Sequence, residues 1–167
     1  MGWNTSALFV EAPRQVVLDA IASLAKLTEH ELHFTEASLG KLAPKMAIAE
    51  LEGWTELWDP TFEISLSPAH EPLRRALSLH GRVLAVLWSS VASQYGFWLY
   101  ERGSLVRAVR YDHGEVADQQ GAPLPQEADI ELPSWGMDED WAFTILERIT
   151  PITSVIRNRT PYRMLTP

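Results

Sequence analysis

The stretch that decides the fold runs from Arg82 to Gln119 and reads "RVLAVLWSSVASQYGFWLYERGSLVRAVRYDHGEVADQ". Its first part is almost entirely apolar, which predicts a strand that is covered on both faces near the centre of a sheet. The runs "QYGFWLY", "LVRAVRY" and "EVADQ" follow, separated by "ERGS" and "DHG". Gly103 and Gly114 fall where short hairpin loops need a residue with positive φ. The stretch therefore predicts an antiparallel meander of three or four strands.

Elements expected around this meander include three helices, which the sequence places near 13–26, 69–79 and 138–149. Apolar residues recur at helical spacing in the first, Ser67 can cap the second, and Asp138 and its acidic neighbours open the third. We expect strands over 6–12 and 62–66, with one or two more in 46–60 that turn near Gly53. Residues 28–45 read as a connector with one short strand, and 122–136 as irregular. The predicted fold is one α+β domain over 1–167, an antiparallel sheet packed by about three helices.

The composition limits the classes of partner. Fourteen Lys and Arg residues against 22 Asp and Glu give a net charge of -8, and no basic stripe is present, so we expect no nucleic-acid partner. The chain has no cysteine, which fits a reducing, cytoplasmic compartment. Its first residues resemble neither a signal peptide nor a spanning helix. Gly2 and Ser6 match a myristoylation pattern, but bulky Trp3 and the lack of a basic cluster argue against it, so we expect no membrane association.

Nucleotide and metal motifs are not supported. Neither glycine-rich phosphate-binding pattern occurs in the sequence. His30 and His33 flank Glu31, but they stand at i and i+3, whereas the metalloprotease helix needs i and i+4. We expect no metal and no cofactor.

A serine hydrolase is one enzymatic alternative. Ser89, Ser90 and Ser93 offer nucleophiles, with His113 as base and Asp112 to orient it. The G-x-S-x-G elbow is missing, and His113 is explained more simply as the central residue of a hairpin loop. We favour the loop interpretation.

The tryptophans with their neighbouring acids suggest two further hypotheses. Trp54 and Trp58 resemble a sugar-binding platform, and the acids around them could supply paired carboxylates, which suggests a carbohydrate-active enzyme. These acids are Glu50, Glu52, Glu56 and Asp59. Alternatively, exposed tryptophans next to acids form a patch for a basic protein, because aromatic residues are enriched at binding hot spots. The residues proposed for that patch are Trp54, Trp58, Trp135, Glu56, Asp59, Asp138 and Asp140. Against both stands the interpretation that the seven tryptophans mostly fill the core.

The segment from Tyr95 to Glu127 also resembles a pattern in an uncharacterised family of small bacterial proteins. The pattern is a "YGF" hairpin that passes through an arginine and further glycines to a "PLP" run and a glutamate. The matching residues are Tyr95, Gly96, Phe97, Tyr100, Gly103, Arg107, Gly114, Gly121, Pro123, Leu124, Pro125 and Glu127. The resemblance implies a shared α+β fold in a bacterial cytosolic protein and no particular activity. Within it, Arg107 is expected on a sheet face, paired with Glu127 or Glu101.

Three functions remain as hypotheses. The leading one is a non-enzymatic protein-binding module of the immunity-protein or regulator type, with a basic partner surface. The alternatives are a small hydrolase or carbohydrate-active enzyme, and a sensor of small molecules with an aromatic pocket. The binding residues predicted for the leading hypothesis are Trp54, Glu56, Trp58, Asp59, Arg107 and Trp135.

Overall fold

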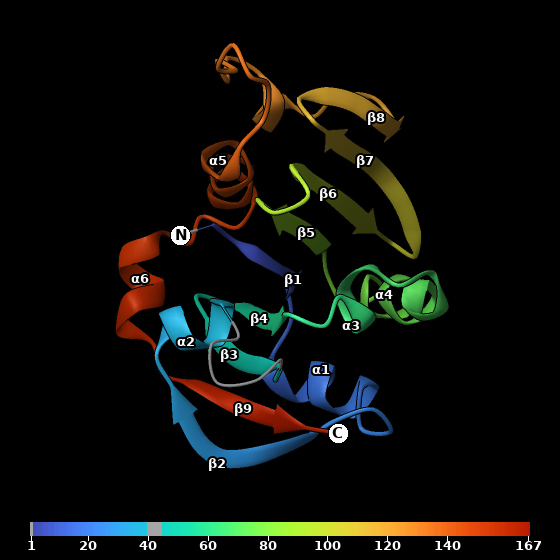
Figure 1. Ribbon diagram of the computed structural model, residues 1–167. Coiled ribbons are helices and arrows are strands. Elements are labelled where there is room, and N and C mark those ends of the chain that lie inside the picture. Colours follow the sequence, from blue (N-terminus) through green and yellow to red (C-terminus); the bar gives the residue numbers. More distant parts are fainter. Residues whose placement is uncertain (1, 40–44) are drawn as a thin grey trace.

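The computed structural model describes residues 2–39 and 45–167, and within them the chain forms one antiparallel sheet with helices on both faces (Figure 1). The strands are β1 (Asn4–Val10), β2 (Lys26–Leu32), β3 (Ala47–Leu51), β4 (Trp54–Asp59), β5 (Val83–Ser89), β6 (Gln94–Glu101), β7 (Ser104–Asp112), β8 (Glu115–Gln120) and β9 (Tyr162–Thr166). The α-helices are α1 (Arg14–Ala20), α2 (Phe34–Leu39), α3 (Glu63–Leu66), α4 (Glu71–Leu77), α5 (Glu139–Ile149) and α6 (Ser154–Arg159). Two short 3-10 turns, η1 (Pro68–His70) and η2 (Pro125–Glu127), complete the secondary structure. The predicted α+β single-domain class is confirmed.

The nine strands of the described residues follow the order β2-β9-β3-β4-β1-β5-β6-β7-β8. Strand β1 lies at the centre and pairs antiparallel with β4 on one side and β5 on the other. The predicted meander is confirmed as β5 to β8, each strand antiparallel to the next. Both tight turns in it use a left-handed pair, Arg102–Gly103 and His113–Gly114, with φ of 51° and 81°, and 50° and 81°. Two successive residues with positive φ match the right-handed twist of the strands.

Both faces of the sheet are buried at its centre, which explains why the central strands read as continuous apolar runs. Phe9, Trp58 and Trp88 point to the face covered by α2, α5 and α6. Leu8, Leu57 and Ala85 point to the face covered by α1, α3 and α4. Strands buried on both sides lose the apolar–polar alternation of a one-sided sheet.

Several predicted elements differ from the structure. Residues 62–66 form helix α3 instead of a strand, because Phe62 adopts a left-handed φ of 63° directly after β4. Helix α1 ends at Ala20 and not near 26, since the chain turns there and begins β2 at Lys26. The described part of the predicted connector contains the end of β2 and helix α2, and its residues 40–44 lie outside the described residues. Strand β9 inserts between β2 and β3 although no strand was predicted there. Strand β9 and helix α2 lie in the half of the molecule where strands from opposite ends of the sequence pair, and α2 packs against β9.

Candidate functional site

Strand β4 carries four of the six predicted binding residues, and all four are buried. Trp54 is 3% exposed, and Glu56, Trp58 and Asp59 are 0% exposed. The strand lies between β3 and β1, so helices cover both of its faces. The expected surface patch and sugar platform on these residues are therefore wrong, and the core interpretation of Trp54 and Trp58 holds.

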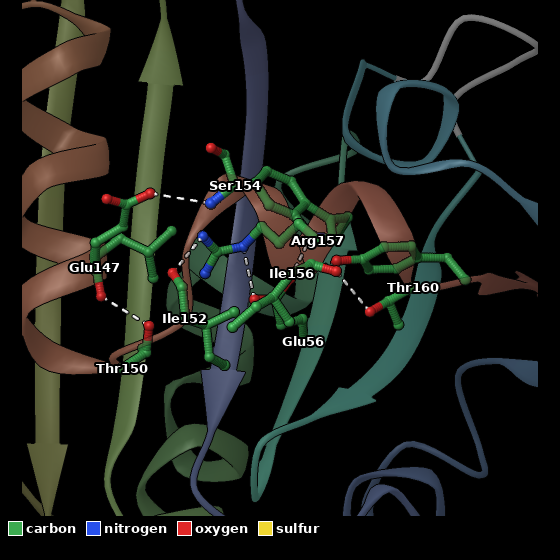
Figure 2. Close-up of polar contacts among 11 residues, drawn as sticks. Glu56, Glu147, Thr150, Ile152, Ser154, Ile156, Arg157 and Thr160 are labelled. Carbon is green, nitrogen blue, oxygen red and sulfur yellow. Dashed lines mark hydrogen bonds and ion pairs between the residues drawn. The ribbon is translucent and has the colours of Figure 1, made fainter.

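Glu56 is the centre of a buried polar cluster that joins β4 to the C-terminal segment (Figure 2). Arg157 donates from Nε to Glu56 Oε1 at 2.8 Å and from Nη1 to the Ile152 carbonyl at 2.9 Å. Tyr162 donates its hydroxyl to Glu56 Oε2 at 2.8 Å, and Trp58 donates Nε1–H to the same oxygen at 3.1 Å. Burial, with the nearby carboxylate, raises the pKa of Tyr162 well above its usual range. Three side chains of the protein donate to this carboxylate and the cluster is closed to solvent, so its role is to fix α6 and β9 to the sheet.

Asp59 and Trp54 also have structural partners. Asp59 Oδ2 accepts the Ile64 and Ser65 amides at 2.8 and 3.0 Å, so it caps the first turn of α3. The Arg82 guanidinium lies 5.1 Å from the centre of the Trp54 ring. Both residues hold elements together instead of facing a ligand.

The serines near His113 do not form a triad. Ser89 donates to Asn4 Oδ1 at 3.0 Å, and Ser90 Oγ accepts the Trp3 amide at 2.9 Å. The His113 ring contacts Asp112, its side chain is 78% exposed, and the residue lies in the β7–β8 turn as the loop interpretation predicted. Among the hydrogen bonds of the described residues none joins the His113 ring to a serine. No group of three His, Asp or Glu side chains within residues 2–39 and 45–167 is arranged to hold a metal ion.

Arg107 forms the predicted ion pair with Glu127. Its Nε and Nη2 donate to the two carboxylate oxygens at 2.9 and 2.7 Å, and its side chain is 4% exposed. Nη1 donates to the Gly121 carbonyl at 2.8 Å, while Glu127 in turn accepts the Leu124 amide. Arg107 on β7 thus holds the "GAPLPQE" turn that follows β8 through bonds to its Gly121 carbonyl and its Glu127 carboxylate.

Trp135 is the one predicted binding residue that reaches the surface, with 70% of it exposed. It lines a shallow hollow of about 360 Å³ together with Ile130, Glu131, Leu132, Pro133, Asp138, Asp140, Trp141 and Thr144. A side chain at Gly114 would meet the Trp135 carbonyl at 2.4 Å, and one at Gly136 would meet Gly114 Cα at 2.3 Å. The two glycines therefore let the Trp135 loop pack directly against the β7–β8 turn.

The excess acidic charge of the protein lies in the stretch of sequence that includes this hollow, and two arginines from outside the stretch contact it, Arg107 through Glu127 and Arg148 through the Gln126 and Ala128 carbonyls. Between Tyr111 and Glu147 the sequence has ten Asp and Glu residues and no Lys or Arg, whereas the rest of the chain has 14 basic and 12 acidic residues. These 37 residues thus carry a charge of -10, and the remainder +2. The segment forms β8, η2, the Trp135 loop and α5, at the top of Figure 1. We call its exposed surface the acidic face. The distribution of charged residues along the sequence indicates this face, whereas no sequence motif does.

A second hollow lies on the opposite side of the sheet. It has a volume of about 560 Å³, and its walls include the apolar side chains of Leu24, Met46, Ile64 and Leu165. His70, Thr61 and Glu63 supply polar groups at its border. None of the described residues that line it is Trp, Tyr or Phe, so this hollow is aliphatic and differs from the expected aromatic pocket.

Comparison of the chain with protein-family models, with curated proteins and with solved structures finds no match. The resemblance to small bacterial proteins therefore stays a prediction. Within residues 2–39 and 45–167, the structure contains no helix with the length and apolarity to cross a bilayer. The functional argument rests on the acidic face itself.

Proposed function

We propose that the protein is a binding module for another protein, and that the acidic face takes a partner with a basic surface. The observation that carries the proposal is the coincidence of exposed Trp135 with a surface segment that has ten acidic and no Lys or Arg residues. A bacterial cytosolic protein of the immunity or regulator type is the class of protein that fits best.

The acidic face combines exposed apolar side chains with surrounding charged ones, as protein interfaces do. Trp135 and Leu132, 70% and 45% exposed, offer apolar contact area at the hollow. Glu131, Asp138 and Asp140 surround them with negative charge. Tryptophan is enriched among residues that dominate binding energy, while charges at a rim steer a partner of opposite sign.

The rigid support of the loop strengthens the proposal. Below it, the Arg107–Glu127 pair holds the turn after β8, and the Asp138 carboxylate accepts the Trp141 amide at 3.2 Å to start α5. A surface that is ordered before binding loses less conformational entropy when the complex forms. The loop is thus anchored at both ends without using the Trp135 side chain.

Affinity capture from a lysate of the source organism tests the proposal. We expect wild-type protein to retain one protein in stoichiometric amount, and Trp135→Ala and Glu131→Lys to lose it. Val155→Ala and Glu52→Lys are the matched controls, because both positions are exposed and lie outside the acidic face. Capture that is equal in all five proteins, or no stoichiometric partner for the wild type, would refute the proposal.

The aliphatic hollow supports binding of a small apolar ligand as a second candidate function. Its volume of about 560 Å³ lies within the range of ligand pockets, whose walls are mostly apolar with a few polar groups. We expect a medium-chain fatty acid to raise the melting temperature of the wild type and not that of Ile64→Asp/Leu24→Asp. A melting temperature that no acyl chain length changes would remove this candidate.

A further inference from the structure

Strand β8 is one of the two edges of the sheet. In the described parts of the chain, 2–39 and 45–167, it is the last strand in the sheet order, and β7 is its only strand neighbour. Every residue from Glu115 to Gln120 is exposed. An edge of this kind presents backbone N–H and C=O groups to solvent.

The backbone of β8 makes no hydrogen bond that would cover this edge. Among the described residues, the backbone bonds outside the regular elements include none from 115–120. The one side chain that reaches the β8 backbone is Arg107, which donates to the Gln120 carbonyl at 3.4 Å, at the end of the strand. The pairing of β8 with β7 shifts register between Val116 and Asp118, so the outward-facing groups on either side of this bulge are the ones available to a new strand.

The opposite edge, β2, is different in charge. Its Glu29 and Glu31 are both contacted by Arg163 of β9, at 2.8 and 3.6 Å, and Lys26 opens the strand. Edge β8 carries Glu115 and Asp118, and the chain that follows it adds seven more acids before it reaches Arg148. Arg110 lies across from Asp118 on β7, but its guanidinium is 4.0 Å from Asp112.

We propose that β8 accepts an extended, basic segment of a partner protein as a tenth strand of the sheet. Backbone hydrogen bonds along the edge would supply affinity, as in other complexes formed by strand addition. Lys or Arg side chains of the added strand would lie beside Glu115 and Asp118. Two copies of this chain pairing through β8 would place these acids against one another, which charge repulsion disfavours.

The same surface then has two parts. The Trp135 loop packs on the β7–β8 turn through Gly114 and Gly136, so the hollow adjoins the start of β8. A partner that adds a strand at β8 can place a side chain from a neighbouring segment against Trp135. This inference rests on the proposed function and specifies how the partner is held.

The test uses the full chain and a seven-residue peptide that alternates Lys and Val. A second peptide has the same sequence with its valine amides N-methylated, which keeps the charge and removes the donors. We expect the first peptide to slow amide hydrogen exchange over 115–119 and to bind about tenfold tighter than the second, because each lost backbone hydrogen bond weakens binding. The binding of the first peptide should fall severalfold in Glu115→Lys/Asp118→Lys and stay unchanged in Asp19→Lys/Glu52→Lys, which changes the net charge equally.

Several results would overturn the inference. Equal affinity for both peptides would show that charge alone is recognised, and protection at β2 would place the strand at the other edge. A free protein that is dimeric with protected β8 amides would show a second copy on the edge. A captured partner that depends on Trp135 but leaves exchange at 115–119 unchanged would reject strand addition while the proposed function stands; a partner unaffected by Trp135→Ala and Glu131→Lys would reject the proposed function instead.

Discussion

At the scale of single residues, the Glu56–Arg157 pair shows how a buried charge is tolerated and what its loss would cost. Both side chains are 0% exposed, and Glu56 also accepts hydrogen bonds from Trp58 and Tyr162. Arg157 Nη2 has no hydrogen-bond partner among the described residues, and the guanidinium lies 5.7 Å from the centre of the Phe9 ring. Removing one partner would therefore be costly, because the remaining charge would be buried without compensation.

Arg157→Met should lower the free energy of unfolding by roughly 3–5 kcal/mol, because it leaves the Glu56 carboxylate unpaired in the core. Urea denaturation measures this loss. Glu56→Gln in addition should restore a large part of it, since the amide oxygen still accepts from Tyr162 and Trp58 without a charge. Arg163→Met is the control, because the Glu29 partner is 98% exposed and such pairs contribute at most about 1 kcal/mol. Equal losses for Arg157→Met and Arg163→Met would contradict this account.

Tyr162 predicts how stability depends on alkaline pH. Burial, followed by the charge of Glu56, raises its pKa far above that of the unfolded chain, so the folded state favours the protonated phenol. This contribution is complete below a pH of about 10, the pKa of an unfolded tyrosine, and it is lost as the pH rises further. We expect the free energy of unfolding to fall by about 1.4 kcal/mol per pH unit above that point from this residue.

Tyr162→Phe should flatten this alkaline slope even though the variant is less stable at neutral pH. Unfolding by urea at pH 8 to 11 compares the two slopes. Burial also raises the pKa values of Tyr95 and Tyr111, so some slope should remain in the variant. An unchanged slope would show that Tyr162 does not cause the effect.

At the scale of elements, the local sequence pattern correctly predicted the strands that pair with their neighbours along the chain. The β5–β8 meander pairs each strand with the next along the chain, so alternation and turn glycines were sufficient to predict it. Strand β9 pairs with β2, over a hundred residues earlier, and no turn residue signals such a pairing. The prediction that Asp59 is exposed was wrong for a related reason. An acid beside a tryptophan is typical of a surface, and only the fold shows that Asp59 caps α3.

The ion pair between Arg107 and Glu127 was among the pairings predicted from the sequence, and the structure contains it. This bidentate pair and the bond from Arg107 to the Gly121 carbonyl hold the turn after β8. Arg107→Lys should speed amide exchange over 121–128 by tenfold or more, because an ammonium cannot reproduce the planar fork and a lost charge-assisted bond is worth about 1.5–3 kcal/mol. Mass spectrometry of exchanged peptides measures this.

The control for Arg107 is Arg75→Lys. Arg75 also pairs with a glutamate, Glu71, but both side chains are more than a third exposed. Exchange over 121–128 should be unchanged in this variant. If Arg107→Lys left the same exchange unchanged, the turn would have to be held by its prolines and not by the ion pair.

At the scale of the whole molecule, the charge distribution divides the protein into a nearly balanced body and an acidic face. The body carries +2 and contains the buried arginines, while 111–147 carries -10. The net charge of -8 therefore understates the field that a partner meets at this face. A field of one sign accelerates the approach of a basic partner and is screened by salt.

Binding kinetics of the captured partner should therefore separate the roles of charge and of Trp135. Raising the salt from 0.05 to 0.5 M should lower the association rate constant of the wild type by about tenfold or more, because steering operates over a distance that salt shortens. Glu131→Lys/Asp140→Lys should associate slowly at low salt and lose most of this dependence, whereas Trp135→Ala should mainly raise the dissociation rate constant. Asp19→Lys/Glu52→Lys changes the net charge by the same amount on other surfaces, so it should keep most of the wild-type salt dependence. If this control and the Glu131→Lys/Asp140→Lys variant behaved alike, net charge and not the acidic face would control the association.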